Sequence, residues 1–313
     1  MESNSKLKLL GNLACLGAYT IFGFNLISCK TIAIDGNVSP MALFLLRSIG
    51  ALILFWISSL FMDKGSKIEK KDFWKIACAS FLGMFMTQYS FLVAITMTTP
   101  IDASIMQSIA PVLTMLIAAI AIKEKISVHG ITGVMLSLCG VLFIITNTVR
   151  SGGGVNHTSS GGIFFMLLNA LSFSLYIGIF KPLIQKYPVV TFMKWMFLFS
   201  SLMALPFGIG DLIHTNYAAI PADIWVHIAY VIIGATFVSY FLIPFGQKHV
   251  SPAVVCMYSY VQPVIAMGIS LVIGLDSLTF PKIMATVCIF VGVGIANFSP
   301  KRLRRHKTNQ NVL

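Results

Sequence analysis

Charged residues are scarce in this sequence. Asp, Glu, Lys and Arg together make up 10% of its 313 residues, whereas a soluble globular domain contains about 25%. So few charges cannot cover a surface that faces water on all sides. The shortage excludes a soluble enzyme, an intrinsically disordered chain and a soluble nucleic-acid-binding domain.

Residue patterns that bind metals or phosphates are also lacking. The six cysteines all lie inside apolar segments and none forms a C-x-x-C pair, so neither a disulfide framework nor a metal site is expected. No G-x-x-x-x-G-K-S/T segment is present, which argues against nucleotide-driven pumping by this chain. The apolar segments also lack the histidine clusters or paired aspartates of an intramembrane enzyme. We therefore expect no enzyme activity, no metal and no cofactor.

Long apolar runs are what the sequence does contain. Hydrophobic residues make up 57% of the chain, and the mean hydropathy is +0.87. A helix needs about 20 mainly apolar residues to cross the hydrocarbon core of a bilayer. We predict an all-α polytopic membrane protein with ten transmembrane helices. The ten apolar runs are 9–29, 39–61, 73–95, 101–121, 128–146, 160–180, 189–210, 223–243, 253–273 and 281–298.

The lysines and arginines predict the orientation of the chain. If the N-terminus is inside, 17 of the 22 Lys and Arg residues fall in cytoplasmic segments and only 3 fall in outside segments. Such an excess marks the cytoplasmic side. We expect a multi-pass protein of the cell (inner) membrane, with both termini and a basic tail at 299–313 in the cytoplasm. The net charge of +12 is then explained by the cations that orient the chain in the membrane. We expect the bilayer and a small-molecule substrate as partners, with no nucleic acid and no soluble protein.

The two halves of the chain repeat each other. At an offset of 152 residues, three pairs of residues match: Pro111 with Pro263, Glu124 with Asp276, and Gly140 with Gly292. We therefore expect one repeat at 8–146, a second at 160–298, and a Gly-rich extracytoplasmic linker at 147–159. Five spans in each repeat is an odd number, so the second repeat is inverted relative to the first. Inverted helical repeats are typical of secondary transporters, whose site lies near the midplane between them.

Several short segments resemble one family. They are Ile21-Phe22-Gly23-Phe24-Asn25 with Lys30, Leu46-Arg47, Pro111 with the Lys123-Glu124-Lys125-Ile126-Ser127 run, Gln262-Pro263, Leu275-Asp276-Ser277-Leu278-Thr279, and Gly292. In this order, over residues 8–298, they resemble EamA-type carriers of the drug/metabolite transporter superfamily. The family's usual Leu-Gly-Glu reads Ile-Lys-Glu in the first repeat and Gly-Leu-Asp in the second, and Phe22 stands where a Trp is usual. The resemblance implies ten helices around a central cavity and export or exchange of small metabolites.

Two cations lie within predicted spans. Arg47 is about eight residues from the end of its span, or roughly 12 Å deep, and Lys194 is about five residues from the end of its own, or roughly 8 Å deep. A charge at bilayer depth is costly and usually functional, and a cation near each mouth of a cavity could attract a carboxylate. The alternative is that both long side chains reach to the membrane interface.

Uncharged polar residues also lie in the spans. Ser104, Gln107 and Ser108 share one helix face, as do Tyr258 and Gln262 on another. The candidate substrate-binding residues are Asn25, Arg47, Gln88, Gln107, Asn169, Tyr176, Lys194, Tyr240, Tyr258 and Gln262. Amides and phenols can bind an organic cargo, but they can equally form hydrogen bonds between helices.

The expected function is secondary transport. No acid lies deep in a span to hold a cationic drug, so a small amphipathic metabolite with a carboxylate, such as an amino acid, fits best. A lipid-type flippase, a drug exporter of the same fold, and a receptor or assembly component without transport remain as alternatives.

Six residues are expected to be structural. Glu124 and Asp276 sit at matched helix exits, where packing and capping compete with proton coupling as explanations. Pro111 and Pro263 occupy matched positions within spans, and Gly140 and Gly292 are expected to allow close helix packing. Asp102, at the start of its span, is expected to be solvated.

The cation count makes a prediction about topology. On a cysteine-free background, a membrane-impermeant thiol reagent added from outside should label a single cysteine at Gly153 and spare one at Ile68. Labelling only at Ile68 would contradict the topology and the inverted repeat.

Overall fold

The computed structural model describes residues 2–62, 68–121, 128–150, 158–249 and 258–297. Glu124, most of the 147–159 linker and nearly all of the 299–313 tail lie outside these residues. The regular elements in the described part are all helical. Six helical segments are long and apolar enough to cross a membrane: Lys6–Asp35, Pro40–Met62, Lys70–Thr96, Ser160–Phe180, Val189–His214 and Ala222–Gly246. The chain is therefore an all-α, multi-pass membrane protein, while the number ten stays a prediction.

The helices of the first half follow the expected apolar runs. They are α1 (Glu2–Asp35), α2 (Pro40–Met62), α3 (Lys70–Ser80), η1 (Phe81–Met86), α4 (Thr87–Thr96), α5 (Pro100–Gln107), α6 (Ala110–Ala121) and α7 (Val128–Arg150). The breaks use ordinary turn chemistry. Gly36 takes a φ of 77° after α1, which costs glycine little. Thr99 caps α5 by accepting from the Asp102 N–H, with Pro100 in the first turn.

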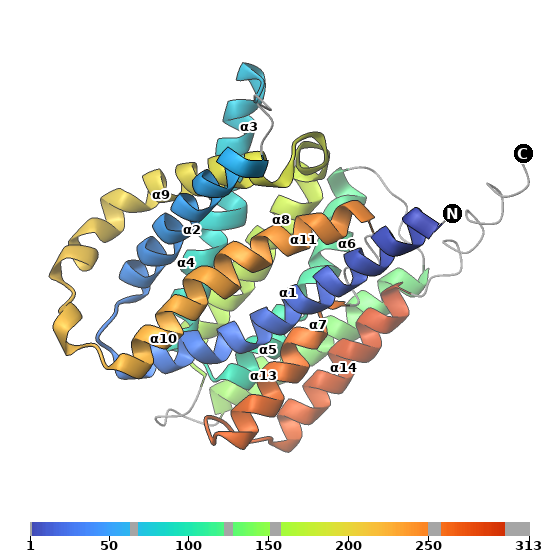
Figure 1. Cartoon of the computed structure of the whole chain (residues 1–313). Helices are drawn as coiled ribbons and strands as arrows, with labels where there is room; N and C mark the ends of the chain where they lie inside the picture. Colours follow the sequence, from blue (N-terminus) through green and yellow to red (C-terminus); the bar gives the residue numbers. More distant parts are fainter. Residues whose placement is uncertain (1, 63–67, 122–127, 151–157, 250–257, 298–313) are drawn as a thin grey trace, which may run out of the picture.

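The helices of the second half have the same general order. They are α8 (Ser160–Lys186), α9 (Val189–His214), η2 (Tyr217–Ala219), α10 (Ala222–Tyr230), η3 (Val231–Val238), α11 (Ser239–His249), α13 (Val261–Val272) and α14 (Phe280–Asn297). Ser159 caps α8 through the Gly162 N–H. In Figure 1, α1 crosses the bundle beside α11, and α7 lies along α14.

Two long helices contain a π-helical segment, which the sequence did not predict. η1 continues α3 into α4, and η3 continues α10 into α11. Just after each, a hydroxyl donates to the carbonyl five residues earlier: Thr87 Oγ1 to Leu82 O at 2.7 Å, and Ser239 Oγ to Gly234 O at 3.2 Å. π-helical turns of this kind occur frequently at functional sites.

A second irregularity is the break between α5 and α6. Pro111 has no N–H, so it cannot donate to the carbonyl of Gln107 and the α-helical bonding is interrupted there. α5 accordingly ends at Gln107 and α6 begins at Ala110. In the second half, two turn residues precede α13, and Pro263 is its third residue. The matched prolines thus lie where helices are interrupted.

α7 and α14 pack more closely than helices with ordinary side chains could. A Cβ on Gly140 would lie 2.9 Å from the Ala285 carbonyl oxygen, and one on Gly292 would lie 2.6 Å from the Gly133 carbonyl oxygen. Small residues permit such approach between membrane helices. This packing joins the end of the first half to the end of the second.

Substitution of these glycines tests the packing. Gly292→Ala should destabilise the protein by about 1–3 kcal/mol, because the new methyl group meets backbone atoms that cannot move aside. Gly294→Ala is the matched control on the same helix, since no atom lies within 4 Å of its Cβ position. A lower melting temperature is expected for Gly292→Ala alone. Equal melting temperatures would contradict the close approach.

Candidate functional site

Arg47 is the most deeply buried charged residue of the described chain. Its exposed fraction is 1%. Its Nε donates to Thr236 Oγ1 at 3.0 Å, and the Thr236 hydroxyl in turn donates to Val231 O at 2.7 Å. Thr236 lies in η3, so the π-helical segment positions the acceptor for Arg47. Nη1 of Arg47 is buried and has no hydrogen-bond partner among the described residues.

Four of the predicted polar residues pair across the two halves. Gln88 of α4 donates through Nε2 to the hydroxyl of Tyr240 in α11. The side-chain amides of Gln107 and Gln262, at the end of α5 and the start of α13, bond to each other. These pairs place polar contacts between the halves, where sequence reasoning expected a site.

Three further candidates are buried within the same bundle. Asn169 Nδ2 donates to the Thr87 carbonyl at 2.7 Å, just beyond η1. Asn25 accepts from the thiol of Cys29 at 3.5 Å. The Tyr176 ring lies so close to Gly83 that a Cβ there would be 2.5 Å from it. The structure therefore uses Asn169 and Tyr176 partly to hold η1 against α8.

Lys194 and Tyr258 do not join this group. The Lys194 ammonium lies 5.4 Å from the ring centroid of Trp56, which is 40% exposed. Lys194 is therefore at the periphery of the bundle, where the cation–π contact and partial exposure lower the free-energy cost of placing its charge in a membrane span. Tyr258 packs against a small cluster that includes Cys15, Tyr19 and Ile243.

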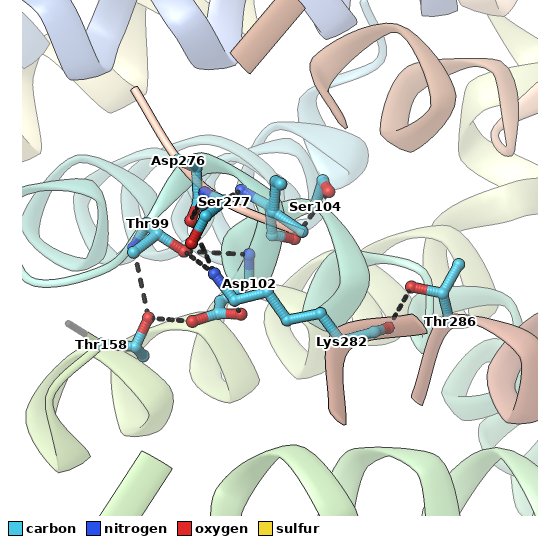
Figure 2. A network of polar contacts seen from close by, with 9 residues as sticks. Thr99, Asp102, Ser104, Thr158, Asp276, Ser277, Lys282 and Thr286 are labelled. Atoms are coloured by element: carbon cyan, nitrogen blue, oxygen red, sulfur yellow. Dashed lines mark hydrogen bonds and ion pairs between the residues drawn. The ribbon is translucent and has the colours of Figure 1, made fainter. Parts of the chain in front are cut away.

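A separate network of charged residues lies at one end of the bundle (Figure 2). We call Thr99, Asp102, Thr158, Asp276 and Lys282 the Lys282 network. Lys282 Nζ lies 2.7 Å from Asp276 and 3.5 Å from Asp102. The three side chains are 14%, 4% and 7% exposed, respectively.

Other bonds tie this network to helix ends. Asp276 Oδ2 accepts from the Ile101 N–H at 3.2 Å, so its carboxylate caps the positive end of α5. Thr158 Oγ1 donates to Asp102 Oδ2 at 2.5 Å. The expectation of a solvated Asp102 is therefore wrong, because the residue is 5% exposed and paired. Sequence reasoning missed Lys282 and Thr158, whose only signals were their positions near helix starts.

A second charged network lies at the opposite end of α8, which is 27 residues long and so spans about 40 Å. We call Glu69, Asp72, Lys75, Lys186 and Tyr187 the Asp72 network. Lys186 Nζ is 2.7 Å from Asp72 and 2.5 Å from Glu69, and Tyr187 donates its hydroxyl proton to Asp72 at 2.7 Å. Both networks join the first half of the chain to the second.

Electrostatics in the exposed part of this network follow from these pairs. Hydrogen bonds from Lys186 and then Lys71 lower the pKa of Glu69. Hydrogen bonds to Asp72 and then Glu69 raise the pKa of Lys186. Both shifts favour the charged forms, so this end of the bundle is held by ion pairs at neutral pH.

Buried polar contacts between helices, with ion pairs at both ends of α8, fit a multi-pass membrane protein, and comparison with known proteins gives its class. The EamA-like transporter family matches residues 9–146 and 160–298. The chain belongs to this family.

Similar proteins carry names of the same class. The "Uncharacterized transporter YetK" of Bacillus subtilis is 25% identical to this chain. The match covers 83% of this chain and 77% of the length of the Bacillus protein. The "Uncharacterized inner membrane transporter YicL" of Salmonella typhimurium is 23% identical over 94% of this chain and 97% of its own. A solved structure titled "Crystal structure of protein" covers 96% of this chain and 99% of its own, with a TM-score of 0.64 at 17% identity. That likeness shows the fold alone.

The burial of the Lys282 network predicts a large effect on stability. Lys282→Met should cost about 3–5 kcal/mol, because two buried carboxylates lose their cation. Lys75→Met is the matched control, since Lys75 also pairs with an aspartate but is 60% exposed. That change should cost less than about 1 kcal/mol. Thermal unfolding in detergent measures both, and equal losses would contradict the importance of burial.

Proposed function

We propose that the chain is a secondary carrier that moves a small, carboxylate-bearing amphipathic metabolite by alternating access. Amino acids are one class of such metabolites. The carrier exports or exchanges its cargo across the cell (inner) membrane, with both termini in the cytoplasm. Ten helices form two inverted repeats, 8–146 and 160–298, joined by the extracytoplasmic linker 147–159.

The pattern of helix packing supports the inverted repeat. α2 packs on α9, and α7 packs on α14, so corresponding helices of the two halves face each other. The pair α1 and α11 has a counterpart in α8 and α4, and the pair α1 and α13 has one in α8 and α6. The π-helical segments η1 and η3 also occupy matched places. Such twofold relations are expected if each half is one copy of the same unit.

The burial of Arg47 is the observation that carries the proposal. A guanidinium with 1% exposure is costly in a membrane bundle unless it has a function or a counter-charge. Its Nη1 lacks a partner in the described part of the chain. A carboxylate on the cargo supplies both the missing hydrogen bond and the missing charge.

Alternating access requires the two ends of the carrier to open in turn. The Lys282 network joins α5 to α14, so opening the mouth at that end must separate Asp102 from Lys282. At the offset of 152, these residues correspond to Val254 and Gly130, which cannot form an ion pair. The two mouths are therefore held by different ion pairs, those of the Lys282 network at one end and those of the Asp72 network at the other.

The alternatives have less support. A carrier or exporter of cationic drugs would need an acid within the bundle, yet the eight described acidic residues lie at helix ends or between helices. A receptor without transport would give no reason for two copies of a transporter unit. A lipid-type flippase would need a lateral opening between helices, which no described feature favours.

Removal of the two candidate cations tests the proposal. Arg47→Gln should reduce transport of a carboxylate cargo at least tenfold, because the neutral amide neither attracts the anion nor forms the forked hydrogen bonds. Lys194→Gln is the control for loss of a cation at the periphery and should change transport less than twofold. The measurement is uptake into proteoliposomes with equal amounts of folded protein. Normal transport by Arg47→Gln would show that Arg47 is a structural residue and would refute the anionic cargo.

A further inference from the structure

Among the described residues, the buried carboxylates are paired with lysines, whereas the buried guanidinium of Arg47 is not paired with an acid. Three buried carboxylates, those of Asp72, Asp102 and Asp276, each have a lysine within 4 Å. In contrast, the described residues provide no acidic partner for Arg47, and the atom in contact with its Nε is a neutral hydroxyl oxygen.

The sequence offers no acid that could fill this gap. Its ten Asp and Glu residues include eight in the described part, all at helix ends or between helices. The other two, Asp63 and Glu124, lie outside the described residues and next to lysines in the sequence. The described residues therefore leave Arg47 without a counter-charge, which an anionic cargo would supply.

We propose that the cargo binds as a net monoanion, a single carboxylate on an apolar body without an ammonium group. The inference rests on the proposed function and narrows its substrate class. A monoanion makes the occupied site neutral, whereas a zwitterion adds an ammonium that has no acid to pair with and leaves the net charge of the site unchanged. Burying unpaired charge is expensive, so the amine group of an amino acid weakens binding.

The surroundings of Arg47 fit such a ligand. Thr236 occupies Nε, so the carboxylate binds at the terminal nitrogens, of which Nη1 has no partner among the described residues. Tyr240, four residues after Thr236 in the same continuous helix, packs edge-on against Phe22 and Phe197, with ring centroids 6.0 and 5.7 Å away. The charged head is thus next to aromatic rings that suit an apolar body.

Pairs of ligands that differ only in the amine group test the inference. The probes are 3-phenylpropanoate against phenylalanine, and 4-methylpentanoate against leucine, added to the full chain purified in detergent at pH 7. Ligand-induced stabilisation is the primary readout, because the protonated acids diffuse through liposomes unaided. We expect each monoanion to bind at least tenfold more tightly than its zwitterionic partner.

Variants of Arg47 identify the group responsible. Arg47→Gln should abolish the preference for the monoanions, Arg47→Lys should keep it in part, and the peripheral control Lys194→Gln should leave it unchanged. Equal binding within each pair, tighter binding of the zwitterions, or no binding by any probe would overturn the inference. So would a monoanion preference that survives in Arg47→Gln.

Transport assays separate this inference from the proposed function. Monoanion binding with no Arg47-dependent flux into proteoliposomes would leave the inference standing and refute the carrier function. Arg47-dependent flux of leucine or phenylalanine without any monoanion preference would support the carrier function and overturn the inference.

Discussion

The cost of an unpaired charge inside a membrane bundle is the constraint on which this structure depends. Ionic groups gather at the two ends of the 27-residue helix α8, where Lys282 and Lys186 neutralise buried carboxylates. Between these ends, polar side chains pair as neutral groups, such as Gln88 with Tyr240. Arg47 alone among the described buried charged residues lacks an opposite charge. Arg47 joins the two halves through Thr236, and its unpaired Nη1 is the group to which the proposed cargo would bind.

The irregular backbone lies close to the same polar contacts. η3 presents Thr236 to Arg47, and η1 is followed directly by Thr87, whose carbonyl accepts from Asn169. Gln107, which ends α5, bonds to Gln262 at the start of α13. Non-helical backbone in a membrane is tolerated where protein or a polar cavity surrounds it. Its concentration at contacts between the two halves is consistent with a site between them.

Composition and apolar runs predicted the all-helical membrane fold, because the bilayer permits few alternatives to helices. The resemblance predicted the family. Side-chain pairing was harder to predict, since it depends on which helices meet. Asp102 looked solvated by its position in the chain, yet Lys282, 180 residues later, buries it. Lys194 and Arg47 were both expected near a mouth of the cavity, but Arg47 is 1% exposed whereas Lys194 lies beside Trp56, which is 40% exposed. The only sequence signal of the π-helical segments was a glycine followed four or five residues later by a hydroxyl residue, as in Gly83 with Thr87 and Gly234 with Ser239.

Symmetry and its local loss have separate consequences for function. Matched helices, matched π-helical segments and the contact of Ser48 with Ser201 at 2.8 Å fit the proposed inverted repeat, in which two conformations of similar energy would let the two mouths open in turn. The ion pairs at the two ends involve residues that do not match in the repeat, so the two conformations of the proposed carrier would differ in energy. In the proposed carrier, the repeat would supply the two states, and the Lys282 and Asp72 networks would together set which of them is more populated without cargo.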